Sequence, residues 1–90
     1  MAVKAKANFV LRQIADEYLI IPLAEERDRV HGIIKLNEAG AWLWECLAAE
    51  KSIDDLVGML CDKYGIEQKA AQRDVEEFIN QLSEIGCIEI

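Results

Sequence analysis

Apolar and polar residues follow two different periods along this chain, and the change of period comes at Asn37. Before Asn37, three runs have the mixture of apolar and polar residues that is typical of β-strands: 9–14, 18–23 and 30–36. The second run is apolar at both alternations, which is typical of a middle strand covered on both faces. Pro22 is expected at the end of that strand, because proline donates no ladder hydrogen bond. The runs therefore predict a three-stranded antiparallel meander.

The third strand of this meander is expected to have one free edge. Its alternation divides it into an inward set and an outward set. The inward set is Val30, Gly32, Ile34 and Leu36, and the outward set is His31, Ile33 and Lys35.

After Asn37 the apolar residues recur at the spacing of one helix face. Asn37 is expected to cap a first helix from residue 38 to about residue 49, because its short side chain accepts a hydrogen bond from the first turn. Trp42 and Trp44 should lie on opposite sides of this helix, since two positions correspond to about 200°.

Two further helices are predicted downstream. Ser52 and Asp55 have the spacing of a capping box at the start of the second helix, and Gly65 is expected to end it in a left-handed conformation. The third helix should run from about residue 67 to residue 85 and end at Gly86. Its predicted apolar stripe is Ala71, Val75, Phe78, Ile79, Leu82 and Ile85.

The two ends of the chain receive different interpretations. Residues 1–7 are small and basic and are interpreted as a flexible arm, whereas residues 87–90 are apolar enough to form a short strand or to pack under the helices. The whole pattern predicts one α+β domain over residues 1–90, winged-helix-like, with an N-terminal three-stranded antiparallel sheet followed by three helices.

Composition narrows the function classes. The net charge of −7 and the pI of about 4.6 argue against nucleic acid as a partner, because nucleic-acid binders usually present a basic face. No apolar run approaches the roughly 18 residues of a membrane span, and the N-terminus lacks a signal-peptide pattern. The cytosol is therefore the expected compartment, with no membrane partner.

The sequence offers few candidate catalytic or metal-binding residues. Three cysteines are widely spaced and His31 is the single histidine, so no zinc-ligand spacing is present. The cysteines are interpreted as small buried apolar residues, with a surface thiol at Cys87 near the terminus as the alternative. Ser52 and Ser83 have ordinary helical roles. Adjacent carboxylates such as Glu76 and Glu77 diverge by about 100° on a helix and do not share a proton. We expect no catalytic residue, no metal and no cofactor, hence no enzyme.

A non-catalytic binding module is the function class that remains. A free edge strand can accept an added strand from an extended peptide, while an adjoining helix offers apolar pockets for side chains. Two alternatives stay open: a winged-helix DNA-binding regulator, and a homodimer in which the free edge pairs with its own copy.

The chain also resembles a known family. The features that carry the resemblance are the join from Gly32 to Trp44, which includes Leu-Asn-Glu-x-Gly, then Tyr64 and the Asp74-Val75-x-x-Phe78 spacing, and they are similar to the PqqD-like family. The resemblance implies a recognition element for ribosomally made precursor peptides. It implies that the leader peptide adds as a strand beside the third strand and is presented to a modifying enzyme, often a radical SAM protein.

The resemblance also implies the binding residues. On the strand they are His31, Ile33, Ile34, Lys35 and Leu36, and on the third helix they are Asp74, Val75, Phe78 and Leu82. A charged residue in place of Phe78 is expected to weaken leader binding while leaving the fold intact, and Lys35 is expected to pair with an acidic side chain of the leader.

Overall fold

A computed structural model describes residues 2–23 and 33–90 of the chain. It is an α+β structure, with two three-stranded antiparallel sheets and three helices in the described residues. The residues predicted as strand at positions 30–32 lie outside the described residues.

The first sheet is the predicted meander. Strands β2 (Phe9–Ile14), β3 (Glu17–Pro22) and β4 (Ile34–Leu36) pair in the order β2-β3-β4, so the middle strand is the one that the sequence indicates. Pro22 ends β3 as expected. The expected cover on both faces is only partial, since Ile20 is buried and its neighbours Leu19 and Ile21 are half-buried.

The faces of β4 are those that the alternation predicts. Ile34 and Leu36 are buried, whereas Ile33 and Lys35 are exposed. In the register of the β3–β4 pair, Lys35 lies opposite Leu19, and Leu36 lies opposite Tyr18.

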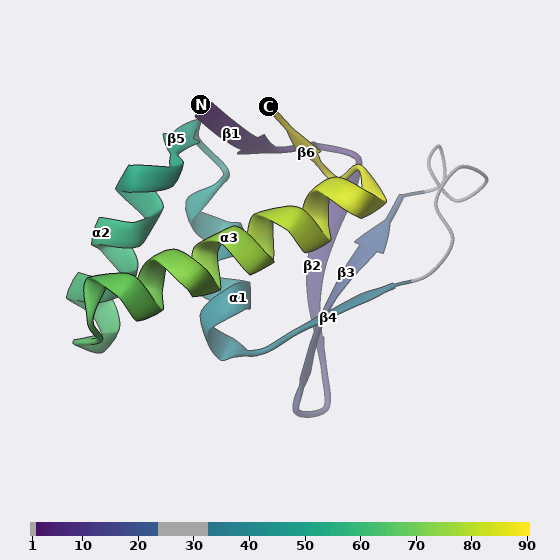
Figure 1. Cartoon of the computed structure of the whole chain (residues 1–90). Coiled ribbons are helices and arrows are strands. Elements are labelled where there is room, and N and C mark those ends of the chain that lie inside the picture. Colours follow the sequence, from purple (N-terminus) through teal and green to yellow (C-terminus); the bar gives the residue numbers. More distant parts are fainter. Residues whose placement is uncertain (1, 24–32) are drawn as a thin grey trace.

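The join between β4 and helix α1 (Glu38–Cys46) is as tight as predicted. The Asn37 side chain accepts a hydrogen bond from the Gly40 backbone N–H at 2.7 Å, and the helix begins at once after it. α1 ends at Cys46, three residues earlier than the apolar pattern suggests, because the chain turns there to reach the second sheet (Figure 1). Trp44 is buried, and Trp42 is half-buried and makes an edge contact with Tyr64.

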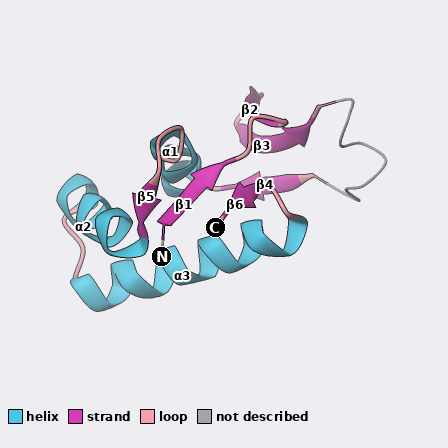
Figure 2. Cartoon of the chain, turned by 90° about the horizontal axis from the view of Figure 1, so that it is seen from above, coloured by secondary structure: helices cyan, strands magenta, loops and turns pink. Residues whose placement is uncertain are grey.

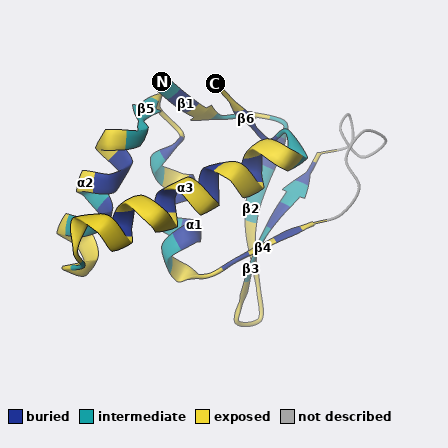
Figure 3. Ribbon diagram, in the orientation of Figure 1, coloured by how far each residue is buried: buried dark blue, intermediate teal, exposed yellow. Residues whose placement is uncertain are grey.

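Helices α2 (Ile53–Tyr64) and α3 (Gln68–Ile85) have the predicted boundaries to within one residue. Ser52 and Asp55 form the reciprocal capping box, and Gly65 and Gly86 end the helices with positive φ angles. Burial runs along one side of α3, and the other side is exposed along its length (Figure 3). No helix in residues 2–23 and 33–90 is long and apolar enough to cross a membrane.

The N-terminal segment departs from the sequence expectation. Residues 1–7 are predicted to be a loose arm, but β1 (Ala2–Ala5) is a strand between β5 (Lys51–Ser52) and β6 (Ile88–Glu89) in the second sheet (Figure 2). Val3 is 0% exposed and belongs to the core. The apolar C-terminal residues therefore do form a short strand, and β1 is its partner.

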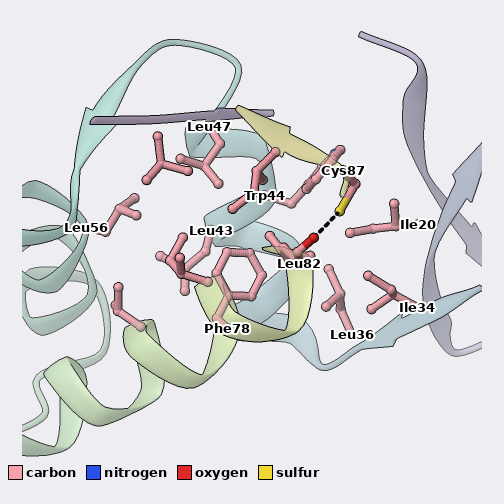
Figure 4. Close-up of a cluster of buried hydrophobic side chains, with 14 of the residues drawn as sticks. Ile20, Ile34, Leu36, Leu43, Trp44, Leu47, Leu56, Phe78, Leu82 and Cys87 are labelled. Atoms are coloured by element: carbon pink, nitrogen blue, oxygen red, sulfur yellow. Dashed lines mark hydrogen bonds between the residues drawn. The ribbon is translucent and has the colours of Figure 1, made fainter. Parts of the chain in front are cut away.

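The cysteines differ in their surroundings. Cys87 is fully buried and its thiol donates to the Leu82 carbonyl at 3.5 Å (Figure 4), whereas Cys46 and Cys61 are half-buried, so the interpretation of all three as buried holds for Cys87 alone. Burial raises the pKa of the Cys87 thiol to about 11.

Candidate peptide-binding groove between β4 and α3

The edge of β4 that faces away from β3 pairs with no other strand in the described part of the chain. β4 passes beside α3, so this edge faces toward a helix rather than another strand (Figures 1 and 2). A helix satisfies its own backbone hydrogen bonds and gives no ladder partner to β4. Backbone N–H and C=O groups along this edge are thus available to an added strand.

A cavity of about 260 Å³ lies next to this edge. It is smaller than the roughly 300–1,000 Å³ typical of small-molecule sites, so it suits individual side chains of an extended segment better than a cofactor. Its lining comes from β4, the join, α1, α2 and α3, and comprises Lys35, Leu36, Asn37, Ala39, Gly40, Leu43, Leu60, Asp74, Glu77, Phe78 and Gln81.

The floor of this cavity is part of the hydrophobic core. Leu36, Leu43 and Phe78 come from three different elements, and their side chains gather in one cluster (Figure 4). Leu36 and Phe78 are each only 6% exposed. The floor is therefore both the apolar bottom of the cavity and a structural contact between β4, α1 and α3.

The rim of the cavity is polar and exposed. Asp74, Glu77 and Gln81 follow one another on α3 at the spacing of a single helix face, and Lys35 stands on β4. The Lys35 ammonium forms a salt bridge with Glu17 of β3, with 2.8 Å between Nζ and Oε1. Glu17 is the diagonal cross-strand neighbour of Lys35, which brings the two side chains to the same face of the sheet.

The structure brings four of the nine predicted site residues together around this cavity: Lys35, Leu36, Asp74 and Phe78. Val75 and Leu82 are 0% exposed and pack in the core instead, and Ile34 is also a core residue. Ile33 is 57% exposed immediately before β4 and does not line the cavity. His31 lies outside the described residues.

Phe78 is 6% exposed and belongs to the core. A charged side chain there would be buried without a partner, so we now expect such a variant to destabilise the fold as well as to weaken binding. Conversely, Glu77 and Gln81 were not predicted. Their signal is their spacing of three and seven residues from Asp74, which puts them on the same face.

No cluster of three or more histidine, cysteine or acidic side chains suited to a metal exists within residues 2–23 and 33–90. Asp74 and Glu77 are one turn apart on an exposed helical face, where their carboxylates are in contact with solvent. The described groove thus offers one strand edge with backbone hydrogen-bonding groups, an apolar floor and a charged rim, and these are the features by which proteins bind an extended peptide.

This combination defines a class of small α+β proteins with an open strand edge beside a helix. The profile of the family described as Coenzyme PQQ synthesis protein D (PqqD) matches residues 17–88 of the chain. The chain belongs to the PqqD family, which confirms the resemblance seen in the sequence.

A solved structure supports the fold. TbiB1, whose structure is of a complex with the TbiA(beta) leader peptide, matches with a TM-score of 0.73 and 22% sequence identity, over 96% of this chain and 94% of that chain. At this identity the likeness concerns the fold. A search of curated proteins gives no match to this chain.

Proposed function

We propose that this chain is a non-catalytic recognition element that captures the leader of a ribosomally made precursor peptide and presents it to a modifying enzyme. The observation that carries the proposal is the outer edge of β4, which pairs with no strand among the described residues and lies beside a cavity with an apolar floor. Membership of the PqqD family supports it, as does the likeness in fold to TbiB1, whose structure contains a leader peptide.

The mechanism is strand addition. A leader segment pairs with the outer edge of β4, and its backbone bonds give a grip that tolerates many sequences. Side chains on one face of the added strand enter the cavity between Leu36 and Phe78, which selects among leaders by shape and polarity. Holding the leader near a docked enzyme raises the effective concentration of the modifiable part of the precursor. The enzyme we propose is a radical SAM protein.

The alternative of a DNA-binding regulator is less well supported. A recognition helix carries basic or amide side chains toward base edges and phosphates. The exposed side of α3 instead carries Asp74, Glu76, Glu77 and Glu84, against Lys69 and Arg73. A negative helix face repels the phosphate backbone.

The test is a titration of the full chain with synthetic peptides that cover each short open reading frame next to its gene. We expect one peptide to shift the backbone amide signals of residues 33–37 and 74–81 in nitrogen-15 NMR spectra. Each residue of that peptide is then N-methylated in turn. Because alternate N–H groups of an added strand face its partner, every second N-methyl group should abolish binding and the others should not.

A cavity-filling variant gives the matched test on the protein. Ala39→Leu adds carbon atoms into the cavity from α1, whereas Ala70→Leu makes the same change at an exposed position of α3 that does not line it. We expect at least about tenfold weaker peptide binding for the first variant and unchanged binding for the second. Equal affinities, uniform tolerance of N-methylation, or amide shifts on another face would each refute strand addition at β4. Self-association through the edge would appear in light scattering as a dimer that the peptide dissociates.

A further inference from the structure

The charges around the groove are unbalanced. Asp74 and Glu77 stand on its α3 side, and neither forms a salt bridge with any described residue. On the β4 side, the single described cation at the rim, Lys35, is already neutralised by Glu17. The groove therefore presents an uncompensated negative charge to whatever enters it, in a protein whose net charge is −7.

The same cavity has an apolar floor under these carboxylates. Asp74, Glu77 and Phe78 all line it, and they occupy neighbouring positions on α3. A ligand side chain that fills the cavity therefore lies near both carboxylates, and the next side chain on the same face of the ligand strand is the one that can extend to them. Side chains on one face of a strand are two residues apart.

From this geometry we infer that the captured peptide carries a lysine or arginine two residues from the apolar side chain that fills the cavity, with its cation against Asp74 and Glu77. This inference rests on the proposed function and specifies the peptide class. An acidic side chain at the same place would meet two carboxylates, and to reach Lys35 it would have to displace Glu17. Like charges at close range disfavour that arrangement.

The experiment starts from a displayed library of random peptides, longer than one strand, selected on the immobilised full chain. We expect the enriched sequences to share a basic residue two positions from an apolar one. An enriched peptide and its Lys/Arg→Gln version are then titrated against the wild type, the double variant Asp74→Asn/Glu77→Gln and the control Glu76→Gln. Glu76 is on the same helix but does not line the cavity, and its carboxylate accepts from Gln72.

Removal of the peptide cation should weaken binding by about threefold to tenfold on the wild type and on Glu76→Gln, and should have no effect on the double variant. The difference in affinity between the basic peptide and its Gln version should also decline as salt is added. A basic preference unchanged in the double variant, no basic preference, or an acidic preference that depends on Lys35 would each overturn the inference. These outcomes leave the proposed function standing as long as the peptides shift the amides of residues 33–37. If no selected peptide shifts those amides, both the inference and the proposed function fail.

Discussion

Substitution of Gly40 by alanine probes the join on which the groove depends. An added Cβ would lie 3.2 Å from the Asn37 Oδ1 atom and 3.4 Å from two side-chain atoms of Leu36. The same Oδ1 atom accepts the hydrogen bond that caps α1 at 2.7 Å. The new methyl group and the cap therefore compete for one oxygen, and the other neighbour is a buried residue of β4.

The magnitude follows from two contributions. Glycine to alanine inside a helix stabilises by up to about 1 kcal/mol. Disruption of the Asn37 cap costs about 1 kcal/mol, whereas the distances of 3.4 Å to Leu36 are ordinary van der Waals contacts and add no further cost. Gly40→Ala should thus bring no net gain in the free energy of unfolding.

Gly58→Ala is the matched control. Gly58 lies inside α2, and a Cβ there meets no heavy atom within 4 Å, so the full helical gain of about 1 kcal/mol is expected. The two variants should differ by about 1 kcal/mol, or by about 6 °C in the midpoint of thermal unfolding for a domain of this size. Circular dichroism during thermal and urea unfolding measures both. If Gly40→Ala raises the midpoint as much as Gly58→Ala does, the proposed conflict at the join is refuted.

Three other predictions concern stability and reactivity. The Cys87 thiol should resist alkylation in the folded protein near neutral pH, and its pKa, raised from 9.0 to about 11, means that the unfolded chain ionises first. The stability that this thiol contributes is therefore complete below pH 9 and is lost between pH 9 and 11, by about 2 to 3 kcal/mol. The difference in free energy of unfolding between the wild type and Cys87→Ala should shrink by that amount over this range, and a difference that stays constant with pH would contradict the prediction. Val3→Ala should cost about 2 kcal/mol in urea unfolding, because Val3 is fully buried; no loss would mean that β1 does not support the core. Tyr64→Ala should cost about 1 kcal/mol through its edge contact with Trp42, where the ring centroids are 6.1 Å apart, and a change in Trp fluorescence should accompany it.

Local signals in the sequence account for most of the fold. Each helix start and end that was predicted from a short side chain or a glycine is present, because caps depend on neighbouring residues alone. Asn37, Ser52, Gly65 and Gly86 all act as expected. Helical periodicity also identified the buried stripe of α3.

The second sheet had no such signal. β5 and β6 are two residues long, too short for an alternation to appear, and β1 contains three small or polar residues around Val3. Their pairing joins the beginning, middle and end of the chain, and pairings of that kind depend on the tertiary fold rather than on local sequence. The error at residues 1–7 follows from this.

The candidate site divides in the same way. In residues 2–23 and 33–90 no strand pairs with the outer edge of β4, as the predicted strand order implies, and alternation correctly assigns Ile34 and Leu36 to the core side. What the sequence does not reveal is how deeply α3 packs. Val75 and Leu82 therefore belong to the core, although the resemblance implied that they line a groove.

That depth of packing constrains how specificity arises in this groove. The floor residues Leu36 and Phe78 hold β4 and α3 together, so changing them costs core stability, about 3 to 5 kcal/mol for a phenylalanine replaced by alanine. The rim residues Asp74, Glu77 and Gln81 are exposed, and substitutions there usually change stability by no more than about 0.5 kcal/mol. The backbone edge of β4 is indifferent to sequence. Under the proposed function, discrimination between peptides is therefore expected to change through the charges at the rim, while the contribution of the edge and the floor to binding stays constant.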